Sequence, residues 1–207
     1  FAIIGAYGRM VEVKSGRVVS LEVPKDAENQ RVFQSEQSDA LVSTYREGKE
    51  AVLASFSSTG SLLWRKPVAT GASPSVRNVV ISPSGDHIAV MAGELPQDRI
   101  TVYDATGQEL WGRSVPPGNY AMSFAPDGSR LLLIHRDGHT LFTVADGKAV
   151  WEKPLPLPEI NDKGTLIATK VLANGSRFVV ATRSALSTEA GKRPHQTTSR
   201  VNGPDLI

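Results

Sequence analysis

Histidine is the side chain best suited to metal binding or proton transfer in this sequence, and the chain has four. His135 and His139 stand on either side of residues 136–138, a charged, glycine-containing run typical of a hairpin turn. Across so short a turn, two imidazoles and the Asp137 carboxylate could bind a surface metal ion. A polar turn is the simpler interpretation, and we favour it. The other two histidines are isolated, so we predict no metal site.

Groups suited to catalysis do not form a recognisable constellation. The chain has no cysteine, which excludes disulfides, thiolate zinc sites and a cysteine nucleophile. It also lacks a Gly-x-Ser-x-Gly element, a phosphate-binding loop and a His-Glu-x-x-His motif. Carboxylates such as Asp104 and Asp146 stand in predicted turns, where a carboxylate commonly caps its own turn. We therefore predict a protein that is not an enzyme, with no catalytic residues and no cofactor.

A Gly-x-x-x-Trp element occurs three times and organises the chain. The copies begin at Gly60, Gly107 and Gly147 and end at Trp64, Trp111 and Trp151. A period of roughly 40–47 residues is typical of repeats built from four-stranded units. We expect each tryptophan in the outermost strand of its unit, largely buried at the joint with the neighbouring unit. The glycine permits the positive φ that a tight turn requires.

A second element runs in phase with the first. Ser82–Gly85 and Ala125–Gly128 combine proline, a small polar residue and glycine, which suits a β-turn, and Leu172–Gly175 is a degenerate third copy. Apolar or β-branched runs of strand length flank each turn. Each unit is thus predicted to have four antiparallel strands, a to d. In the clearest copy these are Arg77–Ile81, His87–Ala92, Arg99–Tyr103 and Gln108–Arg113, with a longer loop over Gly93–Asp98.

These elements resemble the repeats of known β-propellers. Ser82–Gly85 and Ala125–Gly128 are similar to the a–b turns of bacterial WD40-like and TolB-type propellers. Gly-x-x-x-Trp resembles the tryptophan-docking element of quinoprotein-type (PQQ-like) repeats, most closely in Val102–Trp111, whose interval from Asp to Gly is one residue shorter. The resemblance covers most of residues 1–183. It implies an all-β propeller of four-stranded antiparallel blades, in a bacterial protein of the periplasm or the extracellular space.

The blades can be placed along the chain. We predict complete blades at about residues 30–67, 77–115 and 119–156, and partial blades at 1–23 and 165–183. About four to five blades are then present. The first copy lacks strand a and the last has strands a and b, so the two ends do not complement each other. We therefore expect a segment of a larger ring of about six to eight blades. Residues 184–207 are polar and aperiodic, which predicts a loop or linker.

Composition limits the kinds of partner. The formal net charge is +2, so no strong field would attract nucleic acid or an anionic membrane. Hydrophobic residues make up 40% and charged residues 21%, as in ordinary globular proteins. The longest apolar runs have about five residues, far below the ~20 required to span a membrane. A protein partner is the remaining expectation.

Loops on one face of the predicted propeller are the best candidates for a binding surface. The b–c loops and the connections from strand d to the next strand a lie on that face, and they are richer in charge and proline than the c–d turns. Loops on a rigid scaffold commonly carry binding residues. We predict a scaffold for protein interaction or assembly. Its candidate binding residues are Arg46, Lys49, Asp98, Arg136 and Asp137.

Two alternatives stay open. A structural subunit of a larger assembly would pack through the blade sides, and light scattering would distinguish it from a monomeric scaffold. A quinoprotein-like oxidoreductase is suggested by the PQQ-like resemblance, although no matching cluster of Glu, Asn and Asp is recognisable. The absorbance of an added quinone cofactor with calcium would test that alternative.

Overall fold

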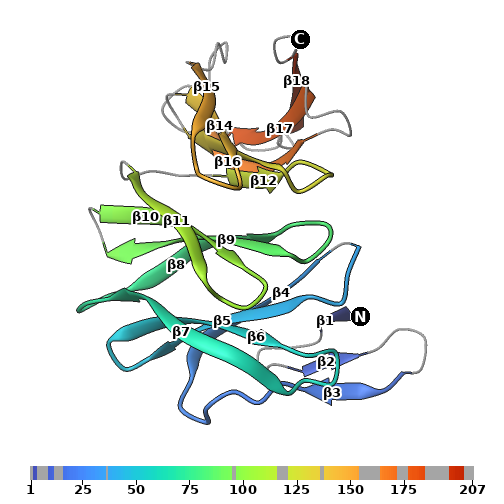
Figure 1. Cartoon of the computed structure of the whole chain (residues 1–207), viewed down its shortest axis with the longest axis vertical. Helices are drawn as coiled ribbons and strands as arrows, with labels where there is room; N and C mark the ends of the chain where they lie inside the picture. Colours follow the sequence, from blue (N-terminus) through green and yellow to red (C-terminus); the bar gives the residue numbers. More distant parts are fainter. Residues whose placement is uncertain are drawn as a thin grey trace, which may run out of the picture. The chain divides into compact units, whose positions relative to one another are not determined.

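The computed structural model describes residues 2–3, 9–11, 16–35, 37–94, 97–115, 121–135, 138–153, 164–171, 177–184 and 196–202. These residues form β-strands joined by turns and contain no helix, and all strand pairs are antiparallel (Figure 1). No helix able to cross a membrane is present in this part of the chain. The chain divides into two compact units, Phe1–Pro117 and Gly118–Ile207.

The described part of the first unit contains three sheets, numbered here in chain order. Sheet 1 consists of β1 (Ala2–Ile3), β2 (Arg9–Val11) and β3 (Val18–Ser20). Sheet 2 consists of β4 (Glu28–Gln34), β5 (Leu41–Glu47), β6 (Glu50–Phe56) and β7 (Leu62–Thr70). Sheet 3 consists of β8 (Ser75–Ile81), β9 (His87–Glu94), β10 (Gln97–Asp104) and β11 (Glu109–Val115). Successive strands pair in each sheet, which is the predicted a–b–c–d order.

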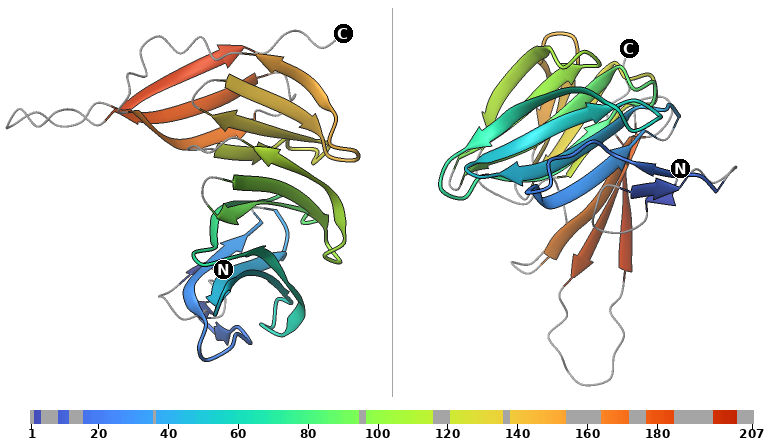
Figure 2. Two further views of the ribbon diagram at one scale, coloured as in Figure 1. Left: turned by 90° about the vertical axis from the view of Figure 1, so that its left-hand side faces the viewer. Right: turned by 90° about the horizontal axis from the view of Figure 1, so that it is seen from below.

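The described part of the second unit contains two further sheets. Sheet 4 consists of β12 (Ala121–Phe124), β13 (Arg130–His135), β14 (Gly138–Thr143) and β15 (Ala149–Lys153). Sheet 5 consists of β16 (Gly164–Val171), β17 (Arg177–Ser184) and β18 (Gln196–Asn202). Figure 2 shows the twist of these sheets from two further directions.

Strand β18 lies inside the segment that was predicted to be a loop or linker. Its residues pair with β17 from Arg177 opposite Asn202 to Arg183 opposite Gln196, so that part of the prediction is wrong. The loop was predicted from the polar composition of residues 184–207. That segment also contains β-branched Thr197, Thr198 and Val201, residue types that favour strands. The edge of β17 supplies the backbone groups with which this run pairs.

The prediction of a longer loop at Gly93–Asp98 is also wrong. Strand β9 continues to Glu94 and β10 begins at Gln97, with Gly93 opposite Asp98 and Glu94 opposite Gln97. Glycine, proline and charged residues indicated a loop, but the hydrogen-bond ladder between the two strands continues through most of them. Asp98 is therefore a strand residue.

The core of the first unit lies between consecutive sheets. The inner strands of sheet 2 are buried on both faces, because successive side chains of a strand point in opposite directions. Leu41 and Tyr45 pack with Val19 of sheet 1, whereas Val42 and Leu53 pack with residues of sheet 3 such as Val90. Burial on both sides explains the apolar run Ala51–Ala54 in β6, whereas β5 also buries the small polar residues Ser43 and Thr44.

A β-bulge precedes each tryptophan of the repeat. Ser55 pairs with Trp64 while the adjacent Phe56 pairs with Leu62, so Leu63 is the extra residue. The same irregularity leaves Leu110 and Val150 as the extra residues in β11 and β15. All three bulged side chains are exposed, Leu63 at 61%. The bulge thus sets the tryptophan relative to its turn in sheets 2, 3 and 4 alike.

Candidate functional site

Sheets 2 and 3 meet along a joint that has two ends. The turn end carries the a–b and c–d turns, at residues 35–40 and 57–61 of sheet 2 and 82–86 and 104–108 of sheet 3. The hairpin end carries the b–c hairpin at residues 47–50 and the connection at residues 71–74, which leads from β7 to β8.

Trp64 connects the two sheets at the turn end. Its Nε1 donates a 2.8 Å hydrogen bond to the carbonyl oxygen of Ala105 in the c–d turn of sheet 3. Its ring lies against Gly107, where an added Cβ would come within 2.8 Å of Cδ2. Gly107 has a φ of +83° and is buried, so both the backbone conformation and the space require glycine. Gly60 is the corresponding residue of sheet 2, and an added Cβ there would lie 2.4 Å from the carbonyl oxygen of Ser20.

The tryptophans of the repeat are not fully enclosed. Trp64 and Trp111 are both half-buried, and the side chain of Trp151 lies outside the description. The outer strand d has no further strand beside it, so one face of the Trp64 indole packs on the neighbouring turn while part of the ring stays accessible. The Lys66 ammonium lies 5.8 Å from the centroid of this ring.

Polar groups strengthen the turn end. Lys66 Nζ donates to the carbonyl oxygen of Gly107 and lies 4.9 Å from the centroid of the Tyr103 ring. The buried Ser35 hydroxyl, at the end of strand β4, lies 3.1 Å from the carbonyl oxygen of Ser82 and 2.8 Å from that of Pro83. The two Ser35 contacts join residues 47 and 48 positions apart in sequence, which is about one repeat period.

Asp104 and Asp146 cap the c–d turns of sheets 3 and 4. Asp104 Oδ1 accepts hydrogen bonds from the Thr106 hydroxyl at 2.7 Å and from the backbone N–H of Thr106 and Gln108 at 2.9 Å each. These bonds, led by the one from the Thr106 hydroxyl, lower the pKa of Asp104. A hydrogen bond from Lys148 is the largest cause of the lowered pKa of Asp146. Both carboxylates therefore stabilise the turn in which they lie.

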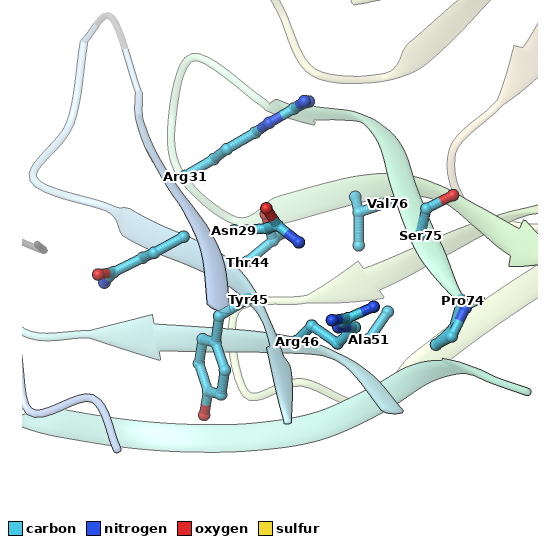
Figure 3. Close-up of a pocket in the computed structure, with 10 residues that line it drawn as sticks. Asn29, Arg31, Thr44, Tyr45, Arg46, Ala51, Pro74, Ser75 and Val76 are labelled. Carbon is cyan, nitrogen blue, oxygen red and sulfur yellow. The ribbon is translucent and has the colours of Figure 1, made fainter. Parts of the chain in front are cut away.

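A pocket of about 450 Å³ opens at the hairpin end of the joint (Figure 3). The first residues of β4, the end of β5 and the start of β8 line it. Asn29, Arg31 and Arg46 supply polar groups, while Ala51, Pro74 and Val76 supply an apolar side. Asn29 has a φ of +54°, a conformation that asparagine adopts more readily than most residues. It lies in a β-bulge at the start of β4, where Glu28 pairs with Arg46 and Arg31 with Thr44.

The equivalent position in sheet 3 is filled by an ion pair. Sheets 2 and 3 can be aligned on the strand pair next to the a–b turn, which is Gln34 with Leu41 in sheet 2 and Ile81 with Ile88 in sheet 3. In this alignment Gln30 corresponds to Arg77. Strands c can be aligned on the residues that pair with the tryptophans, Ser55 in sheet 2 and Val102 in sheet 3. Four residues earlier in each strand, Ala51 then corresponds to Asp98. Arg77 Nε lies 3.3 Å from both carboxylate oxygens of Asp98, whose side chain is fully buried. Sheet 2 therefore has a pocket where sheet 3 has its own charged pair.

The predicted binding residues are distributed unevenly. Arg46 lines the pocket and is paired with Glu28, and Lys49 is exposed at the tip of the β5–β6 hairpin. Asp98 is a buried structural residue rather than part of an exposed loop, because it pairs with Arg77. Arg136 and Asp137 lie outside the described residues. The sequence analysis did not identify Asn29 and Arg31. An alignment of the repeats strand by strand would have shown that sheet 2 has Ala51 where sheet 3 has Asp98, and so would have drawn attention to these neighbouring residues.

The described residues contain no group of three His, Asp or Glu side chains that could hold a metal ion. His139 is buried in β14, while Asp137 and the side chain of His135 lie outside the description, so the alternative of a metal site at this turn stays untested.

A family model that covers nearly the whole chain identifies its family. Residues 9–205 match the family model described as outer membrane protein assembly factor BamB, of the PQQ-like repeat type. The chain belongs to this family. Its repeat elements are therefore those of a PQQ-like β-propeller, and sheets 2 to 4 are complete four-stranded blades. No curated protein sequence matches the chain significantly.

Solved structures confirm the propeller fold. The β-propeller domain of Cps50 (Swd1) from Myceliophthora thermophila is 13% identical, with a TM-score of 0.57 over 89% of this chain and 62% of that one. Hydrazine synthase from Kuenenia stuttgartiensis is 12% identical, with a TM-score of 0.58 over 95% and 64%. The uncharacterised protein lmo1340 from Listeria monocytogenes is 8% identical, with a TM-score of 0.56 over 89% and 58%. The chain thus spans about three fifths of each of these structures.

Proposed function

We propose that this chain is a propeller scaffold without catalytic activity, which binds another protein through the hairpin end of its sheets. The contrast between the two ends of the joint carries the proposal. Side chains of sheet 2 fill the turn end by contacting turns of sheet 3, whereas the hairpin end keeps a pocket and exposed charged residues such as Lys49. Family membership supports the same conclusion, because an assembly factor acts by binding other proteins.

Capture followed by reconstitution tests this function. The immobilised chain is incubated with an extract of its source organism, captured proteins are identified, and the leading candidate is purified for titration. We expect Lys49→Glu to weaken binding of the purified partner by at least ~1 kcal/mol, as at interface hot spots. Asp86→Lys, at an exposed position in the a–b turn of sheet 3, serves as the control for charge reversal at the turn end. Equal effects of both variants would refute a specific role of the hairpin end.

A structural subunit that packs through the blade sides is the second candidate. Exposed leucines on the outer strands support it, namely Leu62 at 37%, Leu63 at 61% and Leu110 at 37%. Apolar side chains that recur beside a sheet edge can pack against another protein. The double variant Leu63→Ser and Leu110→Ser would then dissociate an assembly seen by light scattering. The proposed scaffold predicts no change in mass.

A further inference from the structure

The pocket at the hairpin end does not gather charged groups around one point. Arg46 is paired with Glu28, so its charge is already balanced. Arg31 is exposed and points away from Arg46, so the two guanidinium groups do not converge (Figure 3). None of the lining residues is a carboxylate. An uncharged ligand group therefore suits the pocket better than an ion, because a buried ion would lose its hydration without gaining an opposite charge.

The inner part of the pocket is apolar. Ala51 and Pro74 are buried, and Val76 is half-buried. Ala51 leaves space because its side chain ends at Cβ, whereas Asp98 at the corresponding position of sheet 3 has a longer side chain that contacts Arg77. A volume of about 450 Å³ is enough for one aliphatic side chain and the backbone next to it. Burial of such a side chain against these residues would favour binding.

Asn29 adds a hydrogen-bonding group beside this apolar space. It is the only non-glycine residue with a positive φ, +54°, in the part of the chain that the structure describes. Glycine would adopt this conformation without steric cost, so the backbone alone does not require asparagine here. The side-chain amide extends from β4 toward Val76 of β8 (Figure 3), and no residue that the structure describes forms a hydrogen bond with it. The neighbouring amide of Gln30, in contrast, donates to Ser43 Oγ at 3.3 Å.

An extended polypeptide matches both features. A side-chain amide has donors and an acceptor, so it can bind the C=O and N–H groups of a peptide backbone. Extended peptides are commonly recognised by hydrogen bonds to their backbone together with a pocket for a side chain. The unpaired amide of Asn29 and the apolar surface of Val76 and Ala51 supply these two elements in one pocket.

We infer that this pocket takes one aliphatic side chain from an extended segment of a protein partner, and that the Asn29 amide binds the backbone of the same segment. The inference rests on the proposed function, because it places part of the partner at the hairpin end. It adds the chemistry of recognition, which is an uncharged aliphatic residue such as leucine with accessible backbone on either side.

Titration with defined peptides tests the inference. The probe is the blocked peptide acetyl-Ser-Gly-Leu-Gly-Ser-amide, and NMR spectra of the isotope-labelled whole chain follow its binding. We expect saturable shifts of the Asn29 side-chain amide and of the Val76 methyl groups. Peptides with Ser or Glu in place of Leu should bind at least about tenfold more weakly, because neither fills the apolar space without burying a polar group.

Two variants of the chain remove the two elements separately. Asn29→Gly keeps the backbone conformation and removes the amide, so it should weaken binding of the leucine peptide about three- to tenfold, the scale of a hydrogen bond between uncharged groups. Ala51→Leu fills the apolar space and should abolish saturable binding. Gln37→Gly and Ala105→Leu make the matched changes at exposed positions of the turn end, and each should change binding less than about twofold.

Several outcomes would overturn the inference. These are the absence of saturable shifts with the leucine peptide, equal binding of the leucine and glutamate peptides, and equal binding by wild type and Asn29→Gly. If Ala51→Leu does not fold, Asn29→Gly and the peptide series decide. Acetyl-leucine methylamide that binds as tightly as the longer peptide would assign the pocket to a small ligand, which also overturns the inference.

The partner identified for the proposed function separates the two claims. If Lys49→Glu weakens binding of that partner while Asn29→Gly and Ala51→Leu do not, the inference fails and the proposed function stands. If none of the three variants weakens it, the proposed function fails.

Discussion

The two ends of the joint between sheets 2 and 3 use the same strands in different ways. At the turn end, Trp64 and Ser35 of sheet 2 reach carbonyl oxygens of sheet 3, and glycine at position 107 lets the indole approach closely. At the hairpin end, the corresponding space is a pocket lined by Asn29 and Arg31. The strand order is the same at both ends, but the pocket lies where β-bulges interrupt the pairing, between Glu28 and Arg31 of β4 and opposite Ala51 and Val52 of β6.

Side-chain volume and charge explain the contrast. A large aromatic ring meets a residue without a side chain at the turn end, which fills the joint. A small residue, Ala51, leaves room at the hairpin end of sheet 2, whereas Asp98 and Arg77 occupy the equivalent place in sheet 3. One end of the joint therefore contributes to stability, and the other can vary with little structural consequence.

Replacing Gly107 with alanine should have the largest effect on stability. The left-handed backbone conformation costs ~1–2 kcal/mol for a residue with a side chain, and the Cβ would overlap the Trp64 ring, which adds ~1–3 kcal/mol. Chemical denaturation should therefore show a loss of roughly 2–5 kcal/mol. Gly48→Ala is the matched control at the hairpin end, because Gly48 has a φ of +58° but open space around it. Similar losses for both variants would show that the joint is not tightly packed there.

Trp64→Ala should destabilise the chain by about 2–4 kcal/mol, toward the lower part of the range for large aromatic residues because the ring is half-buried. Trp64→Phe keeps a ring against Gly107 and loses the hydrogen bond to Ala105. Its loss of unfolding free energy should therefore be smaller than that of Trp64→Ala by at least about 1 kcal/mol. Denaturant unfolding measures both. A loss below about 1 kcal/mol for Trp64→Ala would mean that the docked ring contributes little.

Asp98→Ala should cost about 1–3 kcal/mol, because it removes hydrogen bonds from a buried charged group and leaves Arg77 without its carboxylate. A double-mutant cycle with Arg77→Ala isolates the pair. We expect a coupling energy of at least ~0.5 kcal/mol, the lower limit for residues in contact. Additive effects would indicate that Asp98 is buried for reasons unrelated to Arg77.

Lys49→Ala should have the smallest effect, within about 0.5 kcal/mol, since this exposed residue stands at a hairpin tip. Thermal unfolding can measure the change against Asp98→Ala in the same background. If Lys49→Ala destabilised the chain as much as Asp98→Ala, exposed Lys49 and buried Asp98 would contribute equally to stability, and the distinction drawn here would be wrong.

Much of the fold could be predicted from short sequence elements. Turn residues and strand runs are local signals, so Ser82–Gly85 and Gly107–Trp111 placed β8 to β11 within a few residues. The loop predicted at Gly93–Asp98 and the tail predicted after residue 184 were wrong where composition alone was used. In both places, pairing with a neighbouring strand outweighed local preference.

The sequence by itself determined the repeat, the order of the strands and the tryptophan that docks sheet 2 on sheet 3, because spacing and turn chemistry are properties of the chain. It did not determine that Asp98 is buried with Arg77, or that Asn29 and Arg31 border a pocket. Those facts depend on side chains that are distant in sequence and meet across strands, as Arg77 and Asp98 do at a separation of 21 residues. The tertiary structure decided them, since whether a polar residue faces solvent or a partner depends on what the neighbouring strands place opposite it.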